Sequence, residues 1–314
     1  MPIPPQFFNQ LPTPHRDKLH ATLANPKLPS VDVPRVNAAL VKYDSWIKTL
    51  RSIVDGNGAP DVVLGGLVDQ LNLYKKYIDV DLIFDSPQDF LYREKGQLKL
   101  DNSIVEEFVP WLLNPILLPE LKADEFKFGP TPCYAAIYFD GSLTNKKPGA
   151  GIQVKSKNQD FALSKRLFIR ASHKQDFAES SDVDTYIAYV ATEIKTNLDK
   201  TMFQEACATG RDLRSAVPAA RYFLMCEWLD MTPVSTATTD VEEVLILRGK
   251  RLNSNVRKEF SDNTKRLALK AGFVKYLDQY PFRKDVFGRW IEHIRGLLSD
   301  LVPLEDDVLK KGYF

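Results

Sequence analysis

Apolar residues recur every three or four positions in the first part of the chain, which is the spacing of an amphipathic helix. The pattern runs through 34–54 and stops at the DGNG of 55–58, and it repeats over 62–78. A Gly-Asn-Gly stretch ends a helix because these residues favour turns. The pattern predicts a helical N-terminal region over 1–100, in which the two long helices pack as an antiparallel pair.

A third helix is predicted just before the pattern changes. Ser103 is followed three residues later by Glu106, the arrangement of a capping box, and an apolar face follows until Pro110. In a capping box each side chain accepts a hydrogen bond from the backbone of the other residue. We therefore expect Glu106 to be occupied with capping this helix.

The centre of the chain has the short apolar and alternating runs of β-strands. Strands are predicted at 133–139, 151–156, 160–172, 186–195, 221–229 and 241–248. A Gly/Pro-rich hairpin loop separates the first two. The polar stretch 172–184 is predicted to be a mobile loop.

The order of the elements predicts the fold class. A helix at 200–217 lies between two apolar strands, and a strand, helix, strand succession places the strands parallel. Further helices are expected at 254–272 and 284–301. We predict an α/β protein with a mixed β-sheet flanked by helices, with a core over 101–250, a helical N-terminal extension, and a basic helical C-terminal region over 251–314.

Composition excludes several classes of protein. Apolar residues make up 44% and charged residues 26%, which is typical of a globular protein. The chain shows no leader pattern and no apolar run long enough for a membrane, so a cytoplasmic location is expected. Three dispersed cysteines and four dispersed histidines give no metal-cluster spacing, and neither a phosphate loop nor a Gly-x-Ser-x-Gly motif occurs.

The net charge of +1 conceals an uneven distribution. Residues 248–289 hold 12 Lys or Arg against 4 acids, a local excess of +8, so the rest of the chain carries −7. Such a region suits a surface that binds a polyanion such as double-stranded DNA, although a solvated helical face gives the same pattern. The predicted phosphate contacts are Lys146, Lys147, Arg248, Lys250, Arg251, Arg257 and Lys258, with Lys265 and Arg266 beside them and Asn253, Asn255 and Asn263 as base readers.

The segment YVATEIKTNLDK, 189–200, carries the most specific chemistry. It begins apolar on both faces, as in a strand covered on both sides, and then places Glu193 and Lys195 on one face. Mg²⁺ prefers oxygen ligands, so Asp160, Glu193 and the backbone carbonyl of Ile194 are the predicted metal ligands. Lys195 is predicted to orient or deprotonate an attacking water, or to stabilise the transition state of phosphodiester hydrolysis.

Other residues compete for these roles. Asp140, Asp182 and Asp184 are alternatives to Asp160. Glu107 and Gln204 are predicted accessory residues, and their neighbours Glu106 and Glu205 are near enough in sequence to reach the same place. A Glu-x-Lys pair on a strand is also common at a solvated sheet edge, so the motif alone is equally consistent with a solvent-exposed edge that has no catalytic role.

The spacing of NQD at 158–160 and EIK at 193–195 resembles the PD-(D/E)xK nuclease signature, with Asn158-Gln159 in place of the usual proline pattern. Further blocks, LVDQLNLYK (67–75), IFDS (83–86), SIVEEF (103–108) and the long run from 190 to 229, resemble the BbvCI-like restriction endonucleases. The similarity covers about 60–250 and weakens beyond 250.

That resemblance implies a restriction-endonuclease-like fold and a bacterial type II restriction endonuclease subunit. Such a subunit cuts an asymmetric DNA site with Mg²⁺, or with Mn²⁺ as a substitute. It casts Asp160 and Glu193 as metal ligands and Lys195 as the residue that positions water. Each site in such enzymes cuts one strand, so a second nuclease subunit, identical or different, is implied. The alternatives are a less specific nuclease of repair or antiphage defence, and a non-catalytic DNA-binding protein with a degenerate core.

Overall fold

The computed structural model describes residues 5–122 and 124–299. The helices are α1 (Pro5–Asn9), α2 (Pro14–Leu23), α3 (Val33–Asp55), α4 (Pro60–Lys76), α5 (Phe90–Leu98), α6 (Ser103–Phe108), α7 (Lys200–Ala216), α8 (Ser254–Glu259), α9 (Asn263–Ala268), α10 (Lys270–Gln279) and α11 (Lys284–Ser299). A π-helix, η1 (Tyr77–Phe84), prolongs α4, and two 3₁₀ segments are η2 (Val109–Leu113) and η3 (Pro148–Gly151). The strands are β1 (Lys127–Phe139), β2 (Ile152–Ala171), β3 (Ser181–Leu198), β4 (Arg221–Leu229) and β5 (Glu243–Lys250).

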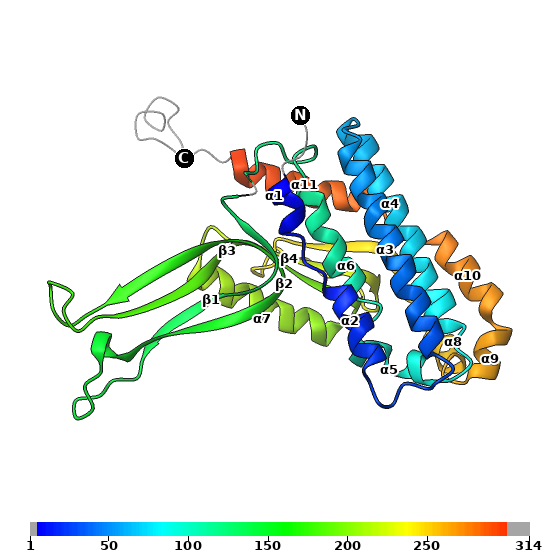
Figure 1. The fold of residues 1–314 in the computed structure, drawn as a ribbon, viewed down its shortest axis with the longest axis horizontal. Coiled ribbons are helices and arrows are strands. Elements are labelled where there is room, and N and C mark those ends of the chain that lie inside the picture. The colour runs from blue at the N-terminus through cyan, green and yellow to red at the C-terminus, as the bar shows by residue number, and fades with distance from the viewer. Residues whose placement is uncertain (1–4, 123, 300–314) are drawn as a thin grey trace.

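The five strands form one mixed sheet in the order β1-β2-β3-β4-β5. Strand β2 pairs antiparallel with both β1 and β3, whereas β3, β4 and β5 are parallel. Helix α7 connects β3 to β4, as the strand, helix, strand pattern predicts. Helices flank this sheet (Figure 1), so the predicted α/β fold class is confirmed.

Strand β2 is longer than the sequence pattern suggests. The runs 151–156 and 160–172 belong to one strand, whose first half pairs with β1 and whose second half pairs with β3. The two ribbons project on the same side of the molecule (Figure 1). Their tips meet where the Gly149 N–H donates to the Glu179 carbonyl at 2.9 Å.

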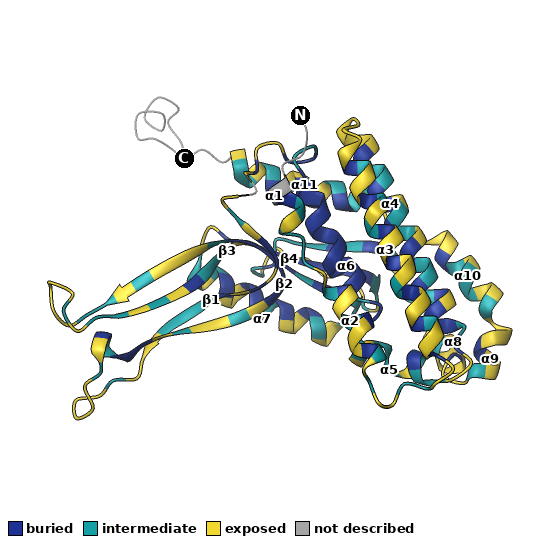
Figure 2. Cartoon of the chain, in the orientation of Figure 1, coloured by how far each residue is buried: buried dark blue, intermediate teal, exposed yellow. Residues whose placement is uncertain are grey.

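The predicted loop over 172–184 is wrong in its second part. Residues 181–184 belong to β3 and pair with 168–171 of β2, even though their side chains are polar. The projecting ribbons are largely exposed (Figure 2), so neither face of this part of the sheet requires apolar residues. Local hydrophobicity therefore gave no signal for the start of β3.

Both faces of the central sheet are buried, which explains the apolar start of β3. One apolar cluster includes Phe161, Ile194 and Phe223 and extends into the N-terminal helices and α11. The opposite cluster includes Ala191 and Leu224 and is covered by α7. A strand in this position needs apolar side chains on both of its faces, because helices cover both sides of the sheet.

The N-terminal helices form as predicted, with α3 and α4 packed side by side (Figure 1). The predicted helix over 254–272 is instead divided among α8, α9 and α10. Asp262 causes one break, because its side chain caps α9 by accepting a hydrogen bond from the Lys265 N–H at 3.0 Å. The predicted helix over 284–301 is confirmed to Ser299, and its last two residues lie outside the described part of the chain.

Among the described residues, no helix is both long and apolar enough to cross a bilayer.

Candidate active site

The structure brings Asp160, Glu193 and Lys195 together at the centre of the sheet. The Asp160 Oδ2 atom accepts a hydrogen bond of 3.0 Å from the backbone N–H of Ile194, the residue between the other two. The Lys195 ammonium lies 2.7 Å from Glu193 Oε1. Two strands adjacent in the sheet thus hold the three predicted side chains in one place.

Asp160 reaches this position because of an irregularity in the sheet. The register of β1 against β2 shifts between Gly129 and Thr131, next to the point where Asp160 leaves the ladder. Bulges of this kind redirect side chains and are frequent beside active sites. The aspartate therefore turns toward β3 at the place where β2 passes from one ribbon to the other.

Tyr222 is a member of the site that the sequence did not indicate. Its hydroxyl donates to Glu193 Oε2, the carboxylate oxygen that Lys195 does not bind. Tyr222 is buried under α7, where a Cβ added to Gly210 would stand only 2.9 Å from the tyrosine ring. A glycine at this helical position lets α7 approach the ring closely, and the ring in turn fixes the orientation of Glu193.

Helix α6 contributes two more polar groups. The Asn102 side-chain amide donates to the Ile194 carbonyl at 3.2 Å and to Glu106 Oε1 at 2.7 Å. The predicted capping box is wrong, since Ser103 donates to the Lys99 carbonyl and α6 has no side-chain cap. Glu106 is therefore not occupied with capping and instead approaches Asp160.

The charges of the site are strongly coupled. Burial alone lowers the pKa of Lys195, but its hydrogen bond to Glu193 and the charges of Glu193, Asp160 and Glu205 outweigh burial and raise that pKa. Burial, together with the negative charge of Asp160, raises the pKa of Glu106. The neighbouring acids thus favour the charged form of Lys195, whereas burial beside Asp160 favours the neutral form of Glu106.

The two predicted accessory residues have different outcomes. Gln204 lies on the exposed side of α7, and it is the next residue, Glu205, whose charge acts on Lys195. Glu107 does not reach the site. Its carboxylate is buried among the N-terminal helices, where it accepts hydrogen bonds from the Tyr43 hydroxyl and from the His15 backbone N–H at 2.8 Å. Consecutive residues of a helix point in different directions, so only Glu106 faces the sheet.

Glu107 is expected to make folding stability depend on pH. Burial raises its pKa from 4.5 to about 7, so the folded protein retains a proton that the unfolded chain releases. Stability from this group therefore falls as pH rises from about 4.5 to 7 and stays constant above. Relative to a Glu107→Gln variant, the wild type should lose up to about 3 kcal/mol across this range.

Urea unfolding of both proteins at pH 5 and pH 7.5 measures this difference. The comparison is needed because His15, whose pKa burial lowers to about 3, contributes in the opposite direction. If the difference in unfolding free energy between the two proteins were the same at pH 5 and pH 7.5, the fold would not raise the pKa of Glu107.

The aspartates that competed with Asp160 lie on the projecting ribbons. Asp140 pairs with Lys147 at 2.7 Å, Asp182 with Arg170 at 2.6 Å, and Asp184 with Arg166 at 2.8 Å. Each pair joins neighbouring parts of a ribbon. Asp160 alone among these four has its carboxylate hydrogen-bonded within the Glu193 to Lys195 segment.

The oxygen atoms of the site suit a hard divalent cation. Among residues 5–122 and 124–299, no three His, Cys, Asp or Glu side chains stand close enough together to hold a metal. The predicted set comprises two carboxylates and the Ile194 carbonyl, which Asn102 holds in a fixed direction. Asp160 uses one oxygen on the backbone, so its other oxygen remains to be shared with an ion, and Mg²⁺ binds with few protein ligands because it retains waters.

Several predicted DNA contacts prove to be structural. Arg248 is buried, donates to the Tyr280 carbonyl at 2.8 Å and lies 3.4 Å from Glu227, so it is not a surface phosphate ligand. Arg266 is fully buried and binds carbonyls such as that of Phe84. These corrections share one cause, because a guanidinium satisfies several backbone acceptors at once and can be buried.

Most of the basic residues in 248–289 form ion pairs with acidic side chains, inside or outside that region. Ion pairs join Arg251 and Arg257 to Asp230, Lys265 to Glu259, Lys270 to Asp85, Arg283 to Asp285, Lys284 to Asp61, and Arg289 to Glu243. Lys250 and Lys258 are exposed, and no ion pair involves them among the described residues. On the ribbons Lys146 is exposed, whereas Lys147 pairs with Asp140.

The proposed base readers also have local roles. Asn253 caps α8 by accepting from the Asn255 N–H at 2.9 Å, and the Asn263 amide donates to the Pro87 carbonyl. Asparagine side chains often serve turns and caps in this way.

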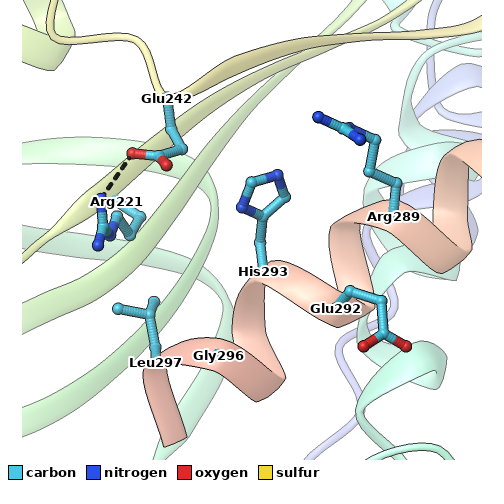
Figure 3. Close-up of a pocket in the computed structure, with 7 residues that line it drawn as sticks. All are labelled: Arg221, Glu242, Arg289, Glu292, His293, Gly296 and Leu297. Carbon is cyan, nitrogen blue, oxygen red and sulfur yellow. Dashed lines mark hydrogen bonds and ion pairs between the residues drawn. The ribbon is translucent and has the colours of Figure 1, made fainter. Parts of the chain in front are cut away.

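A separate hollow of about 330 Å³ lies at the opposite ends of β4 and β5, against α11 (Figure 3). Its charges are paired, with Arg221 2.9 Å from Glu242 and His293 2.7 Å from Glu243. Arg221 and Tyr222 are consecutive residues of β4, so their side chains face opposite sides of the sheet. Arg221 faces α11 in this hollow, whereas Tyr222 faces α7 and the candidate site, so the hollow is not part of that site.

Comparisons with known proteins were made on sequence and on structure. A family model described as Bpu10I restriction endonuclease matches residues 97–314, more than two thirds of the chain. A sequence comparison with curated proteins found no match. A solved structure described as the native BbvCI A2B2 tetramer at low resolution superposes with a TM-score of 0.48 and 17% identity, covering 86% of this chain and 97% of that one.

Proposed function

The chain belongs to the Bpu10I restriction endonuclease family, and on this premise we propose that it is one subunit of a type II enzyme that hydrolyses double-stranded DNA at a specific, asymmetric site. One observation carries the assignment of the active site. The Asp160 carboxylate binds the backbone between Glu193 and Lys195, so acids from two strands and an amine converge at one point.

The proposed cofactor is Mg²⁺, for which Mn²⁺ substitutes. Asp160, Glu193 and the Ile194 carbonyl would hold it, with Glu106 as a further acid beside Asp160. When bound, the ion supplies Lewis acidity at the scissile phosphate and activates water for in-line attack.

The protein's own groups prepare the reaction. Tyr222 and Lys195 orient the Glu193 carboxylate from both sides, and Asn102 fixes the Ile194 carbonyl. Lys195 is placed to orient the attacking water and, as a cation, to balance the negative charge that accumulates on the phosphate.

Cleavage of a defined plasmid with Mg²⁺ tests this function. Discrete fragments are expected once both subunits are present, whereas a smear would indicate a less specific nuclease. Absence of cutting with either Mg²⁺ or Mn²⁺, together with salt-sensitive binding, would indicate a non-catalytic DNA-binding protein.

The single chain is expected to nick a plasmid. One active site cuts one strand, so a double-strand break needs a second active site from another chain. Gel separation of nicked and linear plasmid distinguishes these products. Linear product whose rate rises with the square of chain concentration would show that two identical chains suffice, and nicking that stays first order would require a different partner.

Lys250 and Lys258 are proposed to contact DNA phosphates. Their joint replacement by glutamine should weaken binding and reduce the steepness of its salt dependence by about two phosphate contacts. The matched control is Lys265→Gln, because Lys265 is already paired with Glu259 at 2.9 Å. Filter binding between about 50 and 200 mM salt measures how steeply DNA affinity falls with salt. Equal salt dependence in the double variant and in Lys265→Gln would show that Lys250 and Lys258 do not contact DNA phosphates.

A further inference from the structure

A groove of about 530 Å³ lies between the central sheet and the last turns of α11. Its apolar lining comes from the sheet and from the helix, and it includes Leu163, Val190, Ile294, Leu297 and Leu298. The two leucines at the end of α11 are only partly buried. The described residues therefore leave an apolar surface open beside the end of this helix, and such surfaces often mark a binding site.

At this groove β3 loses its neighbour on one edge. The pairing of β3 with β4 begins at Val190, opposite Arg221, and no strand of the described residues pairs with that edge before Val190. Tyr189 stands at a register shift against β2, is 38% exposed and lines the groove. Native proteins usually cover an exposed strand edge, so this edge points to a further segment of chain beside it.

The charged groups that line the groove are all basic. Lys165, Arg214 and Arg221 belong to its lining, and no Asp or Glu among the described residues does. Arg221 pairs at 2.9 Å with Glu242, in the adjoining hollow of Figure 3. The pairs of Lys165 with Glu125 at 3.4 Å and of Arg214 with Asp240 at 3.7 Å are longer and partly exposed. Such pairs are weak, so the groove keeps a positive potential that suits an acidic partner.

The chain itself has a segment of this chemistry. Residues 300–314 lie outside the described residues, and their sequence is DLVPLEDDVLKKGYF. The first part, 300–307, combines Leu301, Val302 and Leu304 with four acids and no basic residue. This segment directly follows α11, whose last turn lines the groove. Fifteen extended residues span up to about 50 Å, so the segment reaches every part of the groove.

We propose that residues 300–307 bind in this groove of their own chain, with Leu301, Val302 and Leu304 against the apolar lining and the acids of 305–307 facing the basic groups. Burial of the apolar side chains supplies the affinity, and the charges select the register. A second copy of the chain would compete at a disadvantage, because the segment is tethered beside the groove and has a high effective concentration there. The docking does not depend on the proposed nuclease function.

Crosslinking within the full chain tests the docking. The variant carries Ala219→Cys in the groove and Leu304→Cys in the segment, and Ala219 is exposed in the described structure. A Cys207→Ser background removes the one native cysteine that is not buried. A short bismaleimide should join positions 219 and 304 within one chain in most of the protein, as measured by mass spectrometry after digestion.

The matched control pairs Leu304→Cys with Glu120→Cys. Glu120 is exposed and lies near Leu117, whose carbonyl binds Arg295 on a side of α11 that does not line the groove. This control should crosslink at least about fivefold less than the groove pair, because docking raises the local concentration at one place only.

Reversal of charge distinguishes docking from simple tethering. The triple change Glu305→Lys/Asp306→Lys/Asp307→Lys should lower the yield of the groove crosslink about fivefold. Adding Lys165→Glu and Arg214→Glu to that variant should restore part of the yield, since the opposite charges are then exchanged. Circular dichroism establishes that the variants are folded, and Pro218→Cys replaces Ala219→Cys if that variant is not.

Three results would overturn the proposal. A groove crosslink no stronger than the Glu120 control would place the segment outside the groove. Products that join two chains in place of one would assign the groove to a second copy. A yield that charge reversal leaves unchanged would show that the acids of 305–307 do not face the basic groups.

Discussion

Replacement of Lys195 by methionine is expected to lower the rate of DNA cleavage by at least about 100-fold, with little change in folding stability. Lys195 is partly exposed and lies 2.7 Å from Glu193, so methionine fills the space of its stem but removes the cation. The loss should appear in the cleavage rate under saturating DNA rather than in DNA affinity, because the charge acts on the transition state.

Single-turnover cleavage of a plasmid measures this effect, and a binding assay with Ca²⁺ measures affinity separately. Lys165→Met is the matched control, because Lys165 lies on β2 and pairs with Glu125 at the surface. Asp160→Asn and Glu193→Gln should be at least as damaging as Lys195→Met. If any of these three variants cleaved DNA at the wild-type rate, the assignment of the active site to Asp160, Glu193 and Lys195 would be wrong.

Replacement of Lys75 by methionine is expected to destabilise the fold by about 3–5 kcal/mol. The Lys75 ammonium is buried, with Asp79 at 2.7 Å and Glu227 at 3.1 Å. Burial alone lowers the pKa of Lys75, but the charges of Asp79 and Glu227 reverse that effect and raise it. Without the lysine, the buried Glu227 carboxylate keeps only Arg248 to balance its charge, and the partly exposed Asp79 loses its partner.

Urea unfolding measures the loss, and the neighbouring Lys76→Met variant is its control. Lys76 pairs with Asp278 at the surface, so its removal should cost at most about 1 kcal/mol. The double variant Lys75→Met/Glu227→Gln should lose less than the two single variants together, because it removes the unbalanced charge. Equal losses at Lys75 and Lys76 would show that the buried cluster is solvated.

Some parts of the fold were predictable because their signals are local. The three-four spacing of α3 and α4 and the two-faced apolar run of β3 both arise between near neighbours in the chain. The division of the helix predicted over 254–272 was missed for a related reason. Its breaks depend on Asp262 acting as a cap, and an aspartate inside a polar helix face looks the same in the sequence.

The candidate site was predictable only in part. Glu193 and Lys195 lie two residues apart in one strand. Side chains along a strand alternate between its two faces, so these two residues share a face. Tyr222 and Asn102 come from segments about 30 and 90 residues away, and neither has a residue type or spacing that marks it. Arg248 and Arg266 looked like the other basic residues, yet burial among carbonyls and aromatic rings gives them structural roles.

The sequence by itself determined the kinds of element, the apolar cover on both faces of β3 and the presence of an acid and an amine at its end, because these depend on periodicity within one segment. Only the tertiary structure decided which aspartate joins them, that β2 is one continuous strand, and that Glu106 rather than Glu107 faces the sheet. Those outcomes depend on register and packing between segments far apart in the chain, and local patterns do not encode such contacts.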